Sequence, residues 1–132
     1  MKRITIGLLG ILAVLVCLSV AVTAVAEGPT ALQVVSVDVK AKHQAKYFEK
    51  LAKAQTIFAR LGLPAFRVWQ STLAGPNTGG LAIGIEYADM ASFAAGQSKL
   101  QADAEWQKWI EDLRNWDKST VTSNSILIER NP

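Results

Sequence analysis

The sequence predicts an α+β fold: one four-stranded antiparallel sheet that carries helices on one of its faces. Two observations lead to this prediction. Four segments alternate apolar and polar residues with the two-residue period of a strand, and longer stretches between them repeat apolar residues with the period of a helix. The order along the chain is strand, helix, strand, strand, helix, strand, so each helical crossover joins two parallel strands.

The first predicted strand covers residues 32–40 and has two different sides. One side consists of Val35, Val37 and Val39. The other side is mixed and consists of Val34, Ser36 and Asp38. A fully apolar side is typical of a half-buried strand, so we expect the valine side to face the helices.

The first predicted helix follows at residues 41–61. Its apolar stripe recurs at helical spacing through Tyr47, Leu51, Ala54, Phe58 and Leu61. Gly62 suits the left-handed residue that ends many helices, and Pro64 prevents the helix from continuing.

The second and third predicted strands, residues 65–73 and 81–87, form a hairpin. Residues 75–80, Gly-Pro-Asn-Thr-Gly-Gly, are the clearest turn signal in the chain. A loop this short makes the two strands antiparallel neighbours. One face of the third strand is apolar and consists of Leu81, Ile83, Ile85 and Tyr87.

The second crossover is predicted to be two helical segments with a break at residues 101–103. Asp89 and Asp103 stand at the positions of their N-caps. The apolar face of the first segment consists of Met90, Phe93, Ala94 and Leu100, and that of the second of Trp106, Trp109, Ile110 and Leu113. A fourth strand is predicted at residues 120–130.

These elements have the order of the ferredoxin-like split arrangement, β-α-β-β-α-β, with both crossovers on one face of the sheet. We call the opposite face the bare face. We expect it to hold Val34, Ser36, Asp38, Ala82, Gly84 and Glu86. A partner usually covers such a face, and a symmetric dimer is the commonest solution, so we expect a homodimer that pairs through it.

The first 26 residues have the pattern of a secretory signal peptide. Lys2 and Arg3 precede an uncharged run that ends in Ala24-Val25-Ala26, and small residues of this kind mark a cleavage site. The expected organisation is a signal peptide at 1–26, a tether at 27–31 and one domain at 32–132. The mature protein is then secreted or periplasmic.

Two alternatives stay open for this leader. The apolar run approaches the ~20 residues that span a bilayer, so an uncleaved anchor would be the protein's one membrane contact. Lipidation of Cys17 is the other, although Val16 stands where a signal resembling a lipobox has a small residue.

The composition without the leader excludes several classes of function. The chain has 14 Lys and Arg against 11 Asp and Glu; Lys2 and Arg3 lie in the leader, so its removal lowers the net charge from +3 to +1. This balance gives no basic footprint for nucleic acid. Cys17 is the only cysteine and His43 the only histidine. We therefore expect no disulfide and no metal site built from protein ligands alone.

Several segments carry a resemblance to a known family: Arg67-Val68-Trp69-Gln70, Gly75, residues 85–93 (Ile-Glu-Tyr-Ala-Asp-Met-Ala-Ser-Phe) and residues 100–106 (Leu-Gln-Ala-Asp-Ala-Glu-Trp). They resemble the dimeric α/β-barrel superfamily, most of all its NIPSNAP-like and antibiotic-biosynthesis-monooxygenase-like branches. The resemblance implies two sheets packed face to face and a cavity in each subunit. Members of the superfamily range from cofactor-independent oxygenases and haem-using enzymes to proteins with no known activity, so the fold leaves the chemistry open.

Four residues are candidates for ligand binding: Asp38, Arg67, Trp69 and Glu86. The three charged residues stand on different strands and can meet inside the barrel, where they would orient a polar ligand or form a structural ion pair. Trp69 offers an aromatic body either to a ligand or to the core. The alternation leaves open which face of the sheet Arg67 occupies.

Catalysis has two candidates, His43 and Glu86. His43 is the only side chain whose ordinary pKa lies near neutrality, so it can act as a base, as an axial haem ligand, or simply face solvent in the first helical turn. Since the sequence offers no nucleophile–base pair, we expect an exported homodimer that binds a small apolar or aromatic molecule, without a cofactor and without catalysis. The alternatives are a cofactor-independent monooxygenase-like enzyme and a haem-handling protein.

Overall fold

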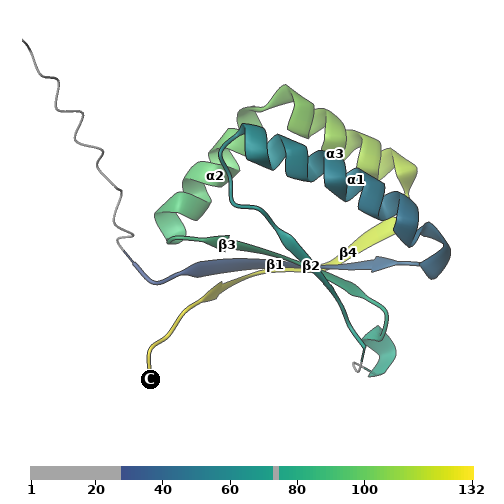
Figure 1. The fold of residues 1–132 in the computed structure, drawn as a ribbon, viewed down its shortest axis with the longest axis horizontal. Helices are drawn as coiled ribbons and strands as arrows, with labels where there is room; N and C mark the ends of the chain where they lie inside the picture. Colours follow the sequence, from purple (N-terminus) through teal and green to yellow (C-terminus); the bar gives the residue numbers. More distant parts are fainter. Residues whose placement is uncertain (1–27, 73–74) are drawn as a thin grey trace, which may run out of the picture.

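The computed structural model describes residues 28–72 and 75–132 (Figure 1). The predicted signal peptide at 1–26, Cys17 included, lies outside the described residues. The elements are β1 (Ala31–Val39), α1 (Ala41–Arg60), β2 (Arg67–Gln70), β3 (Leu81–Tyr87), α2 (Met90–Ala102), α3 (Ala104–Trp116) and β4 (Ser119–Ile128), with a short 3₁₀ helix, η1 (Gly75–Asn77), before β3. Within the described ranges no helix is long and apolar enough to cross a membrane.

The strands form one antiparallel sheet in the order β2-β3-β1-β4. The sheet therefore has β1 and β3 at its centre and β2 and β4 at its edges. The helices lie together on one side of the sheet (Figure 1). This is the ferredoxin-like α+β fold, and its prediction is confirmed.

The strand register assigns side chains to the two faces of the sheet. Val35 pairs with Ile83 on the helix side, and Val34 pairs with Gly84 on the bare face. The predicted apolar sides of β1 and β3 both face the helices, so the predicted faces are confirmed. One residue interrupts the apolar row of β1: Gln33 also faces the helices and is only 8% exposed.

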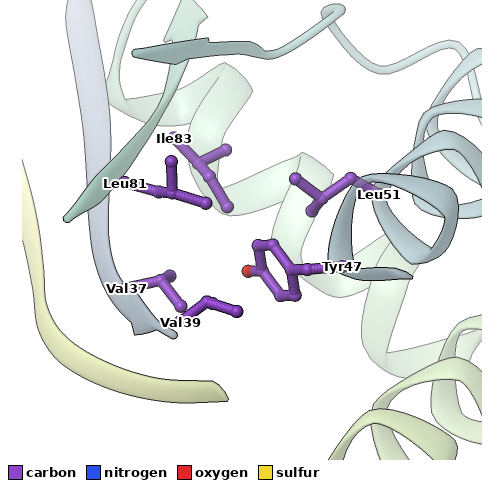
Figure 2. Close-up of a cluster of buried hydrophobic side chains, with 6 residues drawn as sticks. All are labelled: Val37, Val39, Tyr47, Leu51, Leu81 and Ile83. Carbon is purple, nitrogen blue, oxygen red and sulfur yellow. The ribbon is translucent and has the colours of Figure 1, made fainter. Parts of the chain in front are cut away.

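The core between sheet and helices consists of two hydrophobic clusters. The first joins β1, α1 and β3 through Val37, Val39, Tyr47, Leu51, Leu81 and Ile83. Figure 2 shows the Tyr47 ring extending from α1 toward the sheet residues of this cluster. The second cluster consists of Ala31, Phe58, Ile85, Tyr87 and Leu100. Helix α3 adds half-buried side chains to both clusters.

The end of α1 is set by a left-handed turn at Gly62, as the sequence predicts. The φ angle of Gly62 is 69°, which favours glycine. The N–H groups of Gly62 and Leu63 donate to the carbonyls of Ala59 and Phe58 at 3.1 and 2.9 Å. The turn thus satisfies carbonyls that the last helical turn leaves free.

Both predicted aspartate caps are confirmed. At the start of α2, Oδ1 of Asp89 accepts a hydrogen bond from the N–H of Ser92 at 2.7 Å. At the start of α3, Oδ2 of Asp103 accepts from the N–H of Trp106 at 2.9 Å. Each carboxylate satisfies an N–H group that has no partner inside the helix.

Strand β2 is shorter than the predicted 65–73. Before it, the side-chain amide of Gln55 bonds both the N–H and the carbonyl of Phe66, each at 3.2 Å, so these groups do not join the ladder. After it, the N–H of Ser71 donates to Gly80 within the loop. Polar groups at each end thus satisfy the backbone in place of strand pairing.

The buried face of α2 also differs from the prediction. Met90 and Ala94 are exposed, whereas Gly96 and Leu100 are buried. A Cβ at Gly96 would lie 3.1 Å from the side chains of Leu63 and Tyr87. The lack of a side chain at Gly96 lets the helix approach the sheet on that side, which turns Met90 outward.

Candidate functional site

Three of the four predicted ligand-binding residues gather on the bare face. Arg67 pairs with Gly84, which places Arg67 on the same face as Trp69 and Glu86. The Arg67 guanidinium lies 5.6 Å from the centre of the Trp69 ring, and its Nη2 lies 3.9 Å from Oε2 of Glu86. All three side chains are exposed, Trp69 by 50%. This cluster is an open surface rather than an enclosed site.

Asp38, the fourth predicted residue, lies apart from this cluster. It pairs with Thr120 at the far end of β1 and is exposed. It borders a largely polar pocket of about 470 Å³ together with Ser36, Ser71 and Ser123. The structure therefore does not bring Asp38 to Arg67.

His43 is half-buried in the first turn of α1 rather than fully in solvent. Its ring lies edge-on to Trp116, with the ring centres 6.0 Å apart. Burial lowers the pKa of His43 below 6.5, and the charges of Lys42, Lys118 and Lys40 lower it further. The ring therefore favours its neutral form, which is the form of a base.

A mainly apolar hollow between the helices and the sheet was not predicted from the sequence. We call it the helix–sheet cavity. It has a volume of about 320 Å³ and lies where the two hydrophobic clusters meet. Its apolar wall consists of Val35, Val37, Leu51, Ala54, Phe58, Phe66, Ile83, Ile85, Leu100, Trp106, Trp109, Ile110, Leu113 and Val121. None of the four predicted ligand-binding residues lines it.

The position of α3 explains why this space stays open. Helix α3 packs against α1 and α2, and the Trp109 indole N–H donates to the Lys50 carbonyl of α1 at 2.8 Å. Trp106 and Trp109 stack with their ring centres 4.8 Å apart. On the helix side of β4, Ser119, Val121 and Asn124 bring no large side chain beneath α3, whereas Ile126 and Ile128 pack against the second cluster.

The cavity opens beside the edge strand β4. Val121 is 59% exposed and Asn124 is also exposed, and these are the two lining residues on β4. A β-bulge interrupts the pairing of β1 and β4 between these two residues: Ser36 pairs with Ser123, and the next residue, Val37, pairs with Val121. We define the mouth of the cavity by Val121 and Asn124.

The polar groups of the lining are neutral. Three amide side chains, Gln33, Gln97 and Asn124, line the cavity together with Tyr47. The amide Nε2 of Gln33 donates to Oδ1 of Asn124 at 3.0 Å. Burial raises the pKa of Tyr47 to about 12, so its hydroxyl stays protonated at neutral pH. Among the described lining residues, none carries a charge at pH 7.

Two signals in the sequence point to this cavity. The first signal is Gln33, the one long polar residue on the valine side of the first strand. A buried amide at this position needs a hydrogen-bond partner, whereas an apolar side chain would not. The second signal is Asn124, a polar residue on the helix side of the last strand. Either signal alone is weak, because the alternation of a strand does not reveal what packs above it.

The described residues hold no cluster of three or more His, Cys, Asp or Glu side chains that could bind a metal ion. The acidic side chains of Asp38 and Glu86 lie on separate parts of the sheet, and His43 lies at the start of α1.

Comparisons with known proteins identify the fold. No protein-family model matches the chain, and no curated protein matches its sequence. Among solved structures, a NIPSNAP family protein of unknown function from Agrobacterium tumefaciens is 15% identical, with a TM-score of 0.61 over 78% of this chain and 90% of that one. A second NIPSNAP family protein from the same bacterium is 17% identical, with a TM-score of 0.57 over 79% and 89% of the two chains.

A proposed antibiotic biosynthesis monooxygenase from Bacteroides thetaiotaomicron is 16% identical, with a TM-score of 0.50 over 81% of this chain and 91% of that one. The predicted resemblance to the NIPSNAP-like and monooxygenase-like branches is thus confirmed for the fold. At these identities the likeness establishes the architecture and leaves the activity to be argued from the site.

Proposed function

We propose that this chain binds a small apolar or aromatic molecule in the helix–sheet cavity. The lining of the cavity carries the proposal: about 320 Å³ bounded by aliphatic and aromatic side chains, with three amides and one tyrosine as its polar groups. Small-molecule sites are typically concave, of about 300–1,000 Å³, and mainly apolar with a few placed polar groups. The cavity has these properties, and the open bare-face cluster does not.

The lining favours binding over acid–base catalysis. A general acid or base works best when its pKa lies near the working pH, and no described lining residue has such a group. Burial raises the pKa of Tyr47 to about 12, far from the working range of a general acid or base at neutral pH. His43 packs on Trp116 and Glu86 lies on the bare face, so neither catalytic candidate reaches the cavity.

A cofactor-independent monooxygenase is the second candidate. The aromatic wall formed by Trp106 and Trp109 favours it, because a flat aromatic substrate would pack against such a wall. A fold neighbour is itself a proposed antibiotic biosynthesis monooxygenase. Incubating a bound aromatic compound with protein and air, followed by mass spectrometry, separates the two candidates: recovery of the unchanged compound supports binding, and an oxygenated product supports the enzyme.

Blocking the mouth of the cavity tests the binding proposal. Val121→Phe puts a larger side chain at an exposed position on the rim, so the fold should persist while entry is obstructed. We expect affinity for a bound bicyclic aromatic such as indole, measured by calorimetry, to fall by about tenfold or more. Val121→Thr, which keeps the size of the side chain, is the matched control and should bind like the wild type. Equal affinities for all three proteins would contradict the proposed site.

The proposed assembly is a homodimer that pairs through the bare face. This face exposes Trp69 by 50% and Leu127 by 54%. It also carries Arg67 and Glu86, whose opposite charges let a second copy related by a two-fold axis meet the same surface without net repulsion. Exposed apolar side chains with self-complementary charge favour a second copy of this chain over another partner.

Export completes the proposal. It is supported by the leader pattern of residues 1–26, and cleavage would remove that segment before the domain. N-terminal sequencing of the exported protein should begin at Glu27; a sequence starting at Met1 would favour the anchor instead.

A further inference from the structure

The buried amide of Gln33 is half satisfied. Its Nε2 donates to Asn124, but its Oε1 is buried without a hydrogen-bond partner in the described part of the chain. Gln33 as a whole is only 8% exposed and lines the helix–sheet cavity. An amide oxygen withdrawn from water without a donor is unfavourable, so a folded protein normally supplies one.

The surroundings of Gln33 limit where that donor can come from. Its neighbours on the helix side of β1, Ala31 and Val35, have no side-chain donor, and no polar group of the described lining donates to its oxygen. The adjacent Asn124 already accepts from Gln33 through its own oxygen. Because this oxygen is closed off from solvent in the structure, the Gln33 amide has to turn toward the cavity before a molecule bound there can supply the missing hydrogen bond.

The charge of the lining restricts the ligand further. Since the described lining residues are neutral at pH 7, an anion or a cation would be buried without a counter-charge. A neutral ligand avoids that cost. An apolar body would contact Trp106, Trp109 and the aliphatic wall while a single donor faces Gln33.

We propose that Gln33 selects neutral aromatic ligands that carry one hydrogen-bond donor, a hydroxyl or a ring N–H, over ligands of the same shape without one. This inference rests on the proposed function and assigns the specificity of the same cavity to one residue. Asn124 acts as a positioning residue, because its hydrogen bond orients the Gln33 amide so that the nitrogen is used and the oxygen is left for the ligand.

A matched pair of probes tests the proposal. Indole and benzothiophene are neutral fused bicycles of similar size and shape, and indole alone has an N–H donor. We expect the wild-type protein to bind indole about tenfold more tightly in calorimetry, which corresponds to about 1.4 kcal/mol. Gln33→Met keeps the length of the side chain and removes the acceptor, so the ratio of the two affinities should fall to about one.

The control is Gln97→Met, which makes the same substitution at another amide of the lining. It should leave the preference for indole in place, whereas loss of the preference in this variant would transfer the role to Gln97. Thermal unfolding verifies that each variant is folded. If Gln33→Met does not fold, Gln33→Leu replaces it, and the ratio measured on the wild type already tests the proposal.

The outcomes separate this inference from the proposed function. If both probes bind and Val121→Phe weakens the binding of both, the cavity is the site. If the wild-type protein then binds indole and benzothiophene equally, water satisfies Gln33 and the proposed selectivity is wrong. An unchanged ratio in a folded Gln33→Met variant would also overturn it. If neither probe binds, or if Val121→Phe leaves the affinity for both probes unchanged, the proposed function itself is wrong.

Discussion

Gly84 determines how Trp69 lies on the sheet. A Cβ at Gly84 would lie 3.0 Å from Cη2 of Trp69 and only 2.5 Å from its Cζ3, and the second distance is closer than real Cβ atoms approach. The lack of a side chain lets the indole lie over the backbone of β3, with the Arg67 guanidinium above the ring. A glycine inside a strand is thus explained by a neighbouring ring, and it shapes the surface that we propose as the interface.

The substitution Gly84→Ala should displace the Trp69 ring. Because that ring is half-exposed on an edge strand, it can move outward, and we expect the free energy of unfolding to change by less than about 1 kcal/mol. The fluorescence of Trp69, obtained as the difference between spectra with and without Trp69→Phe, should shift toward that of a solvated indole. An unchanged difference spectrum would show that the ring does not depend on the space at Gly84.

The alternation of apolar and polar residues along the strands predicted correctly which face of the sheet several residues occupy. The strand period placed Val34 and Glu86 on the bare face, and the register adds Arg67, whose face the sequence left open. The period could not show that Gln33 lines a cavity, because the cavity depends on how α3 packs over the sheet and on the lack of large side chains at Val121 and Asn124 of β4. The role of these residues in ligand binding stays a prediction.

At the scale of elements, Asp103 joins three helices. It ends α2, caps α3, and accepts a hydrogen bond at 2.7 Å from Arg60 in the last turn of α1. Arg60 also lies 3.1 Å from Glu105. The hydrogen bonds from Arg60 and from the N–H of Trp106 hold the pKa of Asp103 below 3.8.

This lowered pKa predicts how stability depends on acid. The ionised carboxylate contributes to stability above pH 3.8, and that contribution is lost as the pH falls through the lower pKa of the folded state. Asp103→Asn can still cap α3 but carries no charge, so its melting temperature should fall less steeply below pH 4 than that of the wild type. Thermal unfolding of both proteins at several pH values below 4 measures how steeply the melting temperature falls.

The control for this prediction is Asp112→Asn, an exposed substitution on the same helix. It removes one carboxylate from α3 without touching the junction of α1, α2 and α3. If the melting temperature of Asp112→Asn also fell less steeply below pH 4, to the same extent as that of Asp103→Asn, the effect would reflect net charge rather than the Arg60 contact.

The element boundaries show which local signals can be trusted. Ends set by caps were predicted closely, since Gly62, Asp89 and Asp103 act through their own neighbours. The start of β2 was not predicted, because it depends on the amide of Gln55, which lies eleven positions before Phe66 and on another element. The outward turn of Met90 likewise depends on packing around Gly96.

At the scale of the whole molecule, one sheet supports two different surfaces. Its helix side encloses the helix–sheet cavity, and its bare face carries the proposed interface. Edge strand β4 contributes to both, through Val121 at the mouth of the cavity and Leu127 on the bare face. The order of elements predicted this two-sided plan, whereas the volume left under α3 arises from tertiary packing that no single segment encodes.

The dimer can be tested with a substitution on the bare face. Leu127→Lys replaces an exposed apolar side chain on β4 by a charge, and a two-fold interface would bury it twice. Losing a buried leucine costs about 1.5–3 kcal/mol, so two copies should raise the dissociation constant of the dimer by roughly 100-fold or more. Analytical ultracentrifugation of the mature protein should give a dimer for the wild type and a monomer for Leu127→Lys.

Val121→Lys is the matched control, because Val121 is 59% exposed, close to the 54% of Leu127, and lies on the same strand but on the opposite face. Pairing through the bare face predicts that this variant stays dimeric. If instead Val121→Lys dissociates and Leu127→Lys does not, copies associate at the mouth of the cavity, so that assembly would gate the site. A monomeric wild type would leave Trp69 and Leu127 in solvent and would remove the proposed homodimer altogether.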